Sequence, residues 1–74
     1  MNFCPEKMRK AMVEKGLTQA EISRKSGLTP TEVSYLLSGR RRMPRVSTLY
    51  SLSKVLNLSM YELIEDDLPG VLNI

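Results

Sequence analysis

Histidine is absent from this chain, and cysteine occurs only once, at Cys4. Without histidine, the chain lacks the commonest general base and the commonest metal ligand of proteins. A single cysteine can form neither an intramolecular disulfide nor a zinc site by itself, and it is typical of a reduced cytoplasmic setting. We therefore expect a cytoplasmic protein with no enzymatic activity, no metal, no cofactor and no small-molecule ligand.

Long apolar runs are also missing. No run approaches the roughly 18 residues of a membrane span, and the polar N-terminus lacks the apolar core of a signal peptide. We therefore expect no contact with a membrane. The 74 residues suffice for one domain, which at this size buries only about 60% of the surface that its unfolded chain exposes. Its core must be small.

Acidic residues are scarce in the first part of the chain and concentrated in the last. Residues 1–45 hold ten of the eleven lysines and arginines but only four of the eight acidic residues, whereas residues 46–74 carry a net negative charge. Four arginines, Arg40, Arg41, Arg42 and Arg45, fall within six positions. This distribution would draw a polyanion to the first part of the chain. Ordinary solvation of the surface is a weaker explanation for so tight a cluster.

Short capping motifs divide the chain into helices. Thr18, Thr29 and Ser59 are each followed three residues later by glutamate, which is the pattern of a capping box at a helix start. Pro5 and Pro30 suit the first position of a helix. Residues typical of helix ends follow at Gly16, Gly27, Gly39 and Asn57. The pattern predicts an all-α fold of five short helices, and no β-strand alternation is visible.

Apolar residues recur at helical spacing and predict the core. The residues that we expect to face inward are Met8, Ala11, Met12, Leu17, Ile22, Leu28, Val33, Leu36, Leu37, Leu49, Leu52, Leu56, Met60, Leu63 and Ile64. In the third helix the step of about 100° per residue places the polar positions on the side opposite this apolar stripe. Those positions are Thr31, Ser34, Tyr35 and Ser38.

Residues 8–64 resemble the helix-turn-helix domains of the lambdoid phage repressors, of Cro and of the xenobiotic response element (XRE) regulators. The resemblance rests on G-L-T-Q-A-E-I-S at 16–23, G-L-T at 27–29, V-S-Y-L at 33–36 and G-R-R-R-M-P-R at 39–45. It covers about three quarters of the chain, and its spacing of small and apolar residues is specific. It implies a compact five-helix domain of the lambda-repressor type, with a helix-turn-helix formed by the second and third helices.

The resemblance also implies which residues would contact double-stranded DNA. A helix over about 18–25 would cross the DNA backbone, and a recognition helix over about 30–38 would enter the major groove. Positions matching those that face base edges are Pro30, Thr31, Ser34 and Tyr35. Positions matching those that hold the DNA backbone are Gln19, Thr29, Ser38, Arg40, Arg41, Arg42 and Arg45. Each of four positions has an alternative role. Thr29 and Pro30 could serve only as the cap and the start of the helix, and we favour this role for Pro30. Gln19 could be a solvated surface residue, and Tyr35 could pack against a helix edge.

Two departures from the family pattern carry expectations of their own. Many relatives pair an arginine of the first helix with a glutamate near the end of the recognition helix, and this chain has Met12 and Leu37 there. We therefore predict that these two side chains meet in the core. The recognition helix also lacks the forked donors that pair with guanine or adenine, so we expect readout to depend more on apolar contact and DNA shape.

The function that these expectations favour is a sequence-specific transcriptional regulator, a repressor of phage, mobile-element or bacterial type. It would bind as a homodimer with recognition helices about 34 Å apart, and control could come through a regulatory protein partner. Residues 1–65 would form the DNA-binding domain, and the tail 66–74 would contact the second subunit or pack back on the core. The alternatives are an antitoxin, a restriction–modification controller, or an interaction module that no longer binds DNA.

Overall fold

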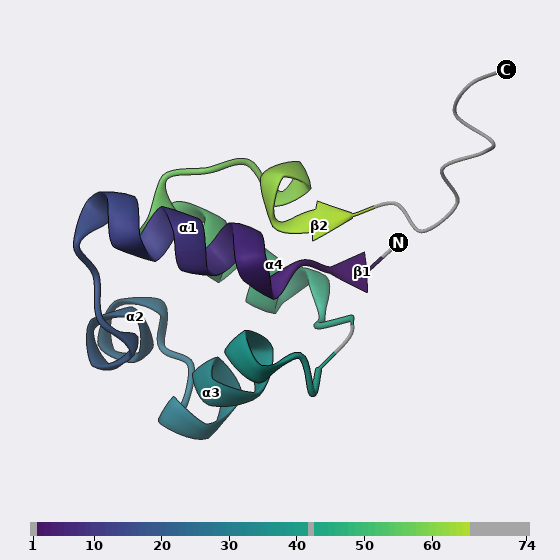
Figure 1. Ribbon diagram of the computed structural model, residues 1–74. Helices are drawn as coiled ribbons and strands as arrows, with labels where there is room; N and C mark the ends of the chain where they lie inside the picture. The colour runs from purple at the N-terminus through teal and green to yellow at the C-terminus, as the bar shows by residue number, and fades with distance from the viewer. Residues whose placement is uncertain (1, 42, 66–74) are drawn as a thin grey trace, which may run out of the picture.

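The computed structural model describes residues 2–41 and 43–65. Their elements follow the chain as β1 (Asn2–Phe3), α1 (Pro5–Lys15), α2 (Gln19–Ser26), α3 (Pro30–Ser38), α4 (Val46–Leu56), a 3-10 helix η1 (Met60–Leu63) and β2 (Ile64–Glu65) (Figure 1). The bounds predicted for the second and third helices agree with the structure to within one residue. None of the described helices is both long and apolar enough to cross a membrane.

The capping boxes at the starts of α2 and α3 form as expected. The Thr18 hydroxyl accepts from the Glu21 amide at 3.2 Å, and the Glu21 carboxylate accepts from the Thr18 amide at 3.1 Å. Thr29 and Glu32 repeat this exchange at 3.1 and 3.2 Å. The hydrogen bond from the Thr18 amide favours the ionised carboxylate and lowers the pKa of Glu21 below its ordinary value.

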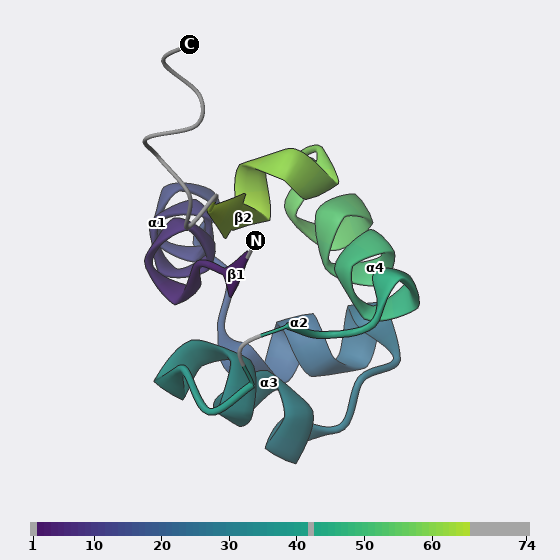
Figure 2. The ribbon, with the colours of Figure 1, turned by 90° about the vertical axis from the view of Figure 1, so that its right-hand side faces the viewer.

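The core lies between the α2–α3 pair at one end of the molecule and η1 with the strand pair at the other (Figure 2). α1 and α4 lie on opposite sides of the core between these two ends. Every residue predicted to face inward belongs to this core or packs against it. The side chains with the least exposure are Met8, Ile22, Val33, Leu36, Leu52, Leu56 and Leu63. Cys4, a free thiol, is also buried, as expected for a small apolar residue near a helix start.

The predicted count of five α-helices is not confirmed, because the described residues contain four. The capping box at Ser59 forms, but the segment after it makes a single 3-10 turn. The turn ends where the backbone becomes extended at Ile64, with φ −123° and ψ 159°. The reason is a tertiary contact: Ile64 pairs with Phe3, and the Leu63 carbonyl accepts from the Cys4 amide at 2.8 Å.

The resulting pair of antiparallel strands was not predicted. Each strand has two residues, which is too short for an alternating pattern to show. Asn2 lies opposite Glu65 and Phe3 opposite Ile64, and the Lys7 ammonium donates to the Ile64 carbonyl at 3.0 Å. These bonds hold the start of α1 against the end of η1. The tail 66–74 lies outside the described residues.

Met12 and Leu37 lie where the departure from the family pattern placed them. Leu37 is buried in the core, and Met12 is half-buried and packed against it. Both border one hollow of about 260 Å³ between α1 and the end of α3. Neither is exposed, as the prediction requires, and the direct contact between their side chains stays a prediction.

Candidate nucleic-acid interface

The turn between α2 and α3 is fixed by short-range bonds. Gly27 takes a left-handed conformation with φ +79°, and the Ser23 hydroxyl donates across the turn to the Leu28 carbonyl at 2.6 Å. The Leu28 amide in turn donates to the Ser26 hydroxyl at 3.2 Å. Ser23 thus does more than supply a small residue, because it ties the end of α2 to the start of α3.

The outer face of α3 is open to solvent. Val33, Leu36 and Leu37 bury its inner face, which fixes the rotation of the helix. The candidate base-contacting positions Pro30, Thr31, Ser34 and Tyr35 are all exposed. Tyr35 keeps 39% of its surface accessible, so the side chain is partly covered and partly available to a ligand. These four side chains share one surface because α3 is a regular helix.

Thr29 and Ser38, two candidate backbone contacts, already use their hydroxyl groups at the ends of α3. The Thr29 hydroxyl lies 3.2 Å from a Glu32 carboxylate oxygen and accepts from the Glu32 amide. The Ser38 hydroxyl donates to the Tyr35 carbonyl at 3.2 Å. Either hydroxyl would have to give up a bond within the helix before it could donate to a phosphate, so both residues have a structural role at present.

Gln19 occupies the first position of α2 and is exposed. It borders the 260 Å³ hollow together with an arginine that the sequence did not indicate, Arg9 of α1. The Arg9 guanidinium donates to the Leu37 carbonyl at the end of α3. This contact joins residues 28 positions apart, and no local motif announces it. A cation therefore lines the same hollow as Gln19, between α1, α2 and α3.

The basic segment begins directly after α3. Gly39 ends the helix with φ +82°, and the amides of Arg40 and Arg41 both donate to the Tyr35 carbonyl, at 3.0 and 3.4 Å. Arg40 is exposed and Arg41 is half-buried. The guanidinium of Arg40 lies over the Tyr35 ring, 5.4 Å from its centroid.

The rest of the cluster leads into α4. Arg45 is exposed at the position before α4, and Pro44 beside it is buried. Arg42 lies outside the described residues. The structure thus brings Arg40 onto the outer face of α3, an arrangement that the sequence did not predict, because the path of a loop after a helix depends on its tertiary contacts.

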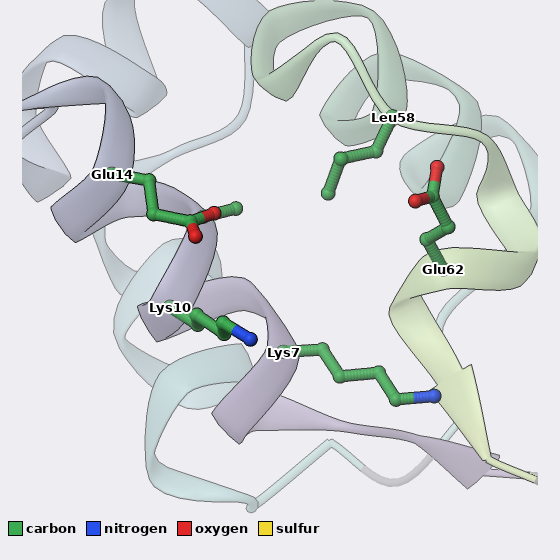
Figure 3. Close-up of a pocket in the computed structure, with 6 residues that line it drawn as sticks. Lys7, Lys10, Glu14, Leu58 and Glu62 are labelled. Carbon is green, nitrogen blue, oxygen red and sulfur yellow. The ribbon is translucent and has the colours of Figure 1, made fainter.

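A second hollow, of about 290 Å³, lies apart from this surface. Its lining comes from α1, the segment before η1 and η1 itself, and includes no residue of α2 or α3 (Figure 3). Lys7, Lys10, Glu14 and Glu62 surround it with both signs of charge, and Leu58 points into it. Within the described part of the chain no group of three or more cysteine, aspartate and glutamate residues could hold a metal ion.

Comparison with known proteins finds relatives of this chain. The chain is 47% identical over 51 residues to the uncharacterized HTH-type transcriptional regulator y4dJ of Sinorhizobium fredii, covering 69% of this chain and 65% of that protein. It is 35% identical over 51 residues to protein P2 of Acyrthosiphon pisum secondary endosymbiont phage 1, covering 69% of this chain and 54% of that protein. The chain thus spans less than two thirds of the length of either relative.

Among solved structures, the fold is similar to that of SinR, a master regulator for biofilm formation, in complex with DNA. The TM-score is 0.78 at 23% identity, with 82% of this chain and 100% of that chain covered. An identity this low shows a shared fold and nothing more. A family model described as helix-turn-helix matches residues 8–63, which is most of the chain. The chain belongs to the helix-turn-helix family of the XRE type.

Proposed function

We propose that the protein is a sequence-specific transcriptional regulator that binds double-stranded DNA through α3 and acts as a repressor. The observation that carries this proposal is the outer face of α3. Its polar positions Thr31, Ser34 and Tyr35 are exposed, while the opposite face is buried. Arginines follow directly at the end of the helix. A protein-interaction module would not need a polar helix face bordered by so many cations.

The chemistry of this face suits the major groove. The hydroxyls of Thr31 and Ser34 can donate to or accept from a base edge, and the Thr31 methyl can contact a thymine methyl. Gln19, Arg9 of the same hollow and the exposed Arg45 are suited to phosphate contacts. Phosphate contacts position a protein on DNA without specifying the base sequence, and salt weakens them.

We further propose that the protein acts as a homodimer in the cytoplasm. One short recognition helix reads only a few base pairs, and two copies related by a two-fold axis would read both halves of a near-palindromic site. The tail 66–74, for which the sequence suggested a contact with the second subunit, lies outside the described residues. The described part leaves Val46 and Tyr50 exposed one turn apart on α4, which offers a second surface for that contact.

The first test uses fluorescence anisotropy to measure binding to random double-stranded DNA at a series of salt concentrations. We expect log affinity to fall linearly with log salt. Arg45→Ala should weaken binding to all sequences and reduce the salt slope by about 1, whereas Thr31→Ala should change the preference among sites by about 1–3 kcal/mol. Lys10→Ala is the matched control, because Lys10 lines the hollow that lies apart from α3.

Binding that is absent at low salt, or indifferent to salt, would contradict DNA binding and favour the interaction module. Equal losses for Thr31→Ala on specific and random DNA would show that the reading face is misplaced. Selection of bound sequences from a random pool then gives the site, and two inverted half-sites are the expected sign of a dimer. A site without symmetry, bound by one copy in sedimentation, would contradict the homodimer.

A further inference from the structure

Arg40 and Tyr35 form one unit at the end of the recognition helix. Gly39, with φ +82°, turns the chain back on itself, and the Arg40 amide then donates to the Tyr35 carbonyl at 3.0 Å. The side chain follows the same direction, so that its guanidinium lies 5.4 Å from the centroid of the Tyr35 ring. The backbone amide and the side chain of Arg40 therefore both contact Tyr35, the candidate base-contacting residue.

A guanidinium that packs with its flat face against an aromatic ring keeps the N–H donors at its edge available to another partner. Those donors lie at the edge of the group in a fixed fork. Arginine bound by two such donors to O6 and N7 of guanine is the commonest specific contact in the major groove. A guanidinium held on a rigid ring has also lost part of its rotamer freedom before binding, so the contact costs less entropy.

We propose that Arg40 reads a guanine in the major groove, held in place by the Tyr35 ring. This inference rests on the proposed function, and it changes the role that the family resemblance implied for Arg40 from backbone contact to base contact. It also supplies the forked donor that positions 30–38 lack. Readout by this protein then includes one strong hydrogen-bonding position in each half-site, next to the base that Tyr35 contacts.

The phosphate reading is the main competitor, and the position of the side chain disfavours it. A side chain that serves phosphate alone has no need to lie over the aromatic residue of the reading face. Arg45, exposed beyond the loop, remains available for that role. The comparison within the molecule is Lys54, whose ammonium lies 5.1 Å from the Tyr50 ring on α4. That pair has similar geometry, but its cation has no fork and it does not lie on α3.

The experiment compares the bound sequences selected from a random DNA pool by the wild-type chain and by three variants. We expect the wild-type site to contain a guanine for which Arg40→Ala loses about 5- to 150-fold of preference, while preferences at the other positions stay unchanged. Arg40→Lys should restore less than half of that factor, because lysine has the charge without the fork. Lys10→Ala, the matched control on the far hollow, should select the wild-type site.

A second measurement tests whether the N7 atom of this guanine accepts a hydrogen bond from Arg40. Replacing the guanine with 7-deazaguanine removes the N7 acceptor and should weaken binding by the wild-type chain at least 5-fold. The Arg40→Ala variant should bind the site with 7-deazaguanine as tightly as the site with guanine. Equal weakening of every sequence by Arg40→Ala, with a smaller salt slope, would assign Arg40 to phosphate and overturn the inference. So would an unchanged site, or equal sensitivity of both chains to 7-deazaguanine. If the wild-type chain binds no DNA at any salt, the proposed function itself is wrong, which is a different result.

Discussion

Exchanging Met12 and Leu37 for the ion pair of their relatives tests how α1 is joined to the recognition helix. The two residues border one hollow, Leu37 is 8% exposed, and Met12 is half-buried. Leu37→Glu alone would place a carboxylate at a buried site without the partner that relatives provide. Met12→Arg alone would add a long cation at the edge of the core. The double variant restores both charges in reach of one another.

The expected magnitudes follow from burial. An uncompensated buried charge typically costs about 3–5 kcal/mol, which is an upper value for Leu37→Glu because Arg9 lines the same hollow. A domain of this length has a free energy of unfolding of only about 4–11 kcal/mol. Leu37→Glu should therefore leave the protein marginally stable. The double variant should recover about 0.5–3 kcal/mol relative to the sum of the two single changes. It should still be less stable than the wild-type chain, by about 1–4 kcal/mol, because both charges must be desolvated.

The assay is urea unfolding at neutral pH followed by far-ultraviolet circular dichroism on all four chains of the cycle. Glu14→Arg combined with Leu37→Glu is the control, because it adds an arginine to the side of α1 that lines the other hollow. The control should show less coupling than the Met12→Arg pair. A coupling energy below about 0.3 kcal/mol for Met12→Arg with Leu37→Glu, or an equal recovery in the control, would refute the contact between these positions.

Three further changes test the rest of the fold. Leu36→Ala should lower the free energy of unfolding by about 2–5 kcal/mol, since Leu36 is fully buried; a loss below about 1 kcal/mol in urea unfolding would contradict its place in the core. Gly39→Ala should cost about 1–2 kcal/mol, because its φ is +82° while an added Cβ would meet no atom within 4 Å; chemical denaturation measures the loss, and no loss would mean that α3 ends differently. The lowered pKa of Glu21 means that its carboxylate stabilises the folded state above the ordinary value of 4.5, and that this contribution is lost as the pH falls through the lower value of the folded state. Glu21→Gln should therefore flatten the acid side of the melting temperature against pH, and an unchanged profile would contradict the capping box.

The helices could be predicted because their signals are local. Thr18 and Glu21, or Thr29 and Glu32, lie within one turn of each other, and the bonds they form depend little on the rest of the chain. The inward and outward faces of α3 could likewise be predicted from a local pattern of residues. One step of about 100° per residue was enough to separate buried Val33 from exposed Ser34.

The elements that could not be predicted depend on contacts between distant residues. The Cys4 amide bonds to the Leu63 carbonyl, and this pairing ends η1 after one turn although the capping box at Ser59 is genuine. In the candidate site the same limit applies to Arg9, whose partner Leu37 lies 28 positions away. Arg40 follows Tyr35 by five positions, and the helical register does not predict their contact because Gly39 ends the helix between them.

The C-terminal end of α3 is close to two cations that the sequence did not predict there, those of Arg9 and Arg40. The C-terminus of a helix carries partial negative charge on its last carbonyls, which would repel a polyanion lying along it. α3 has no basic residue in its own last turn. Its cations come from outside: Arg9 donates from α1 to the Leu37 carbonyl, and Arg40 lies over Tyr35 after the turn at Gly39. The outer face of α3 therefore keeps its polar side chains, while cations from two other segments lie at its negative end. Under the proposed function, this combination would let α3 lie against DNA over its whole length.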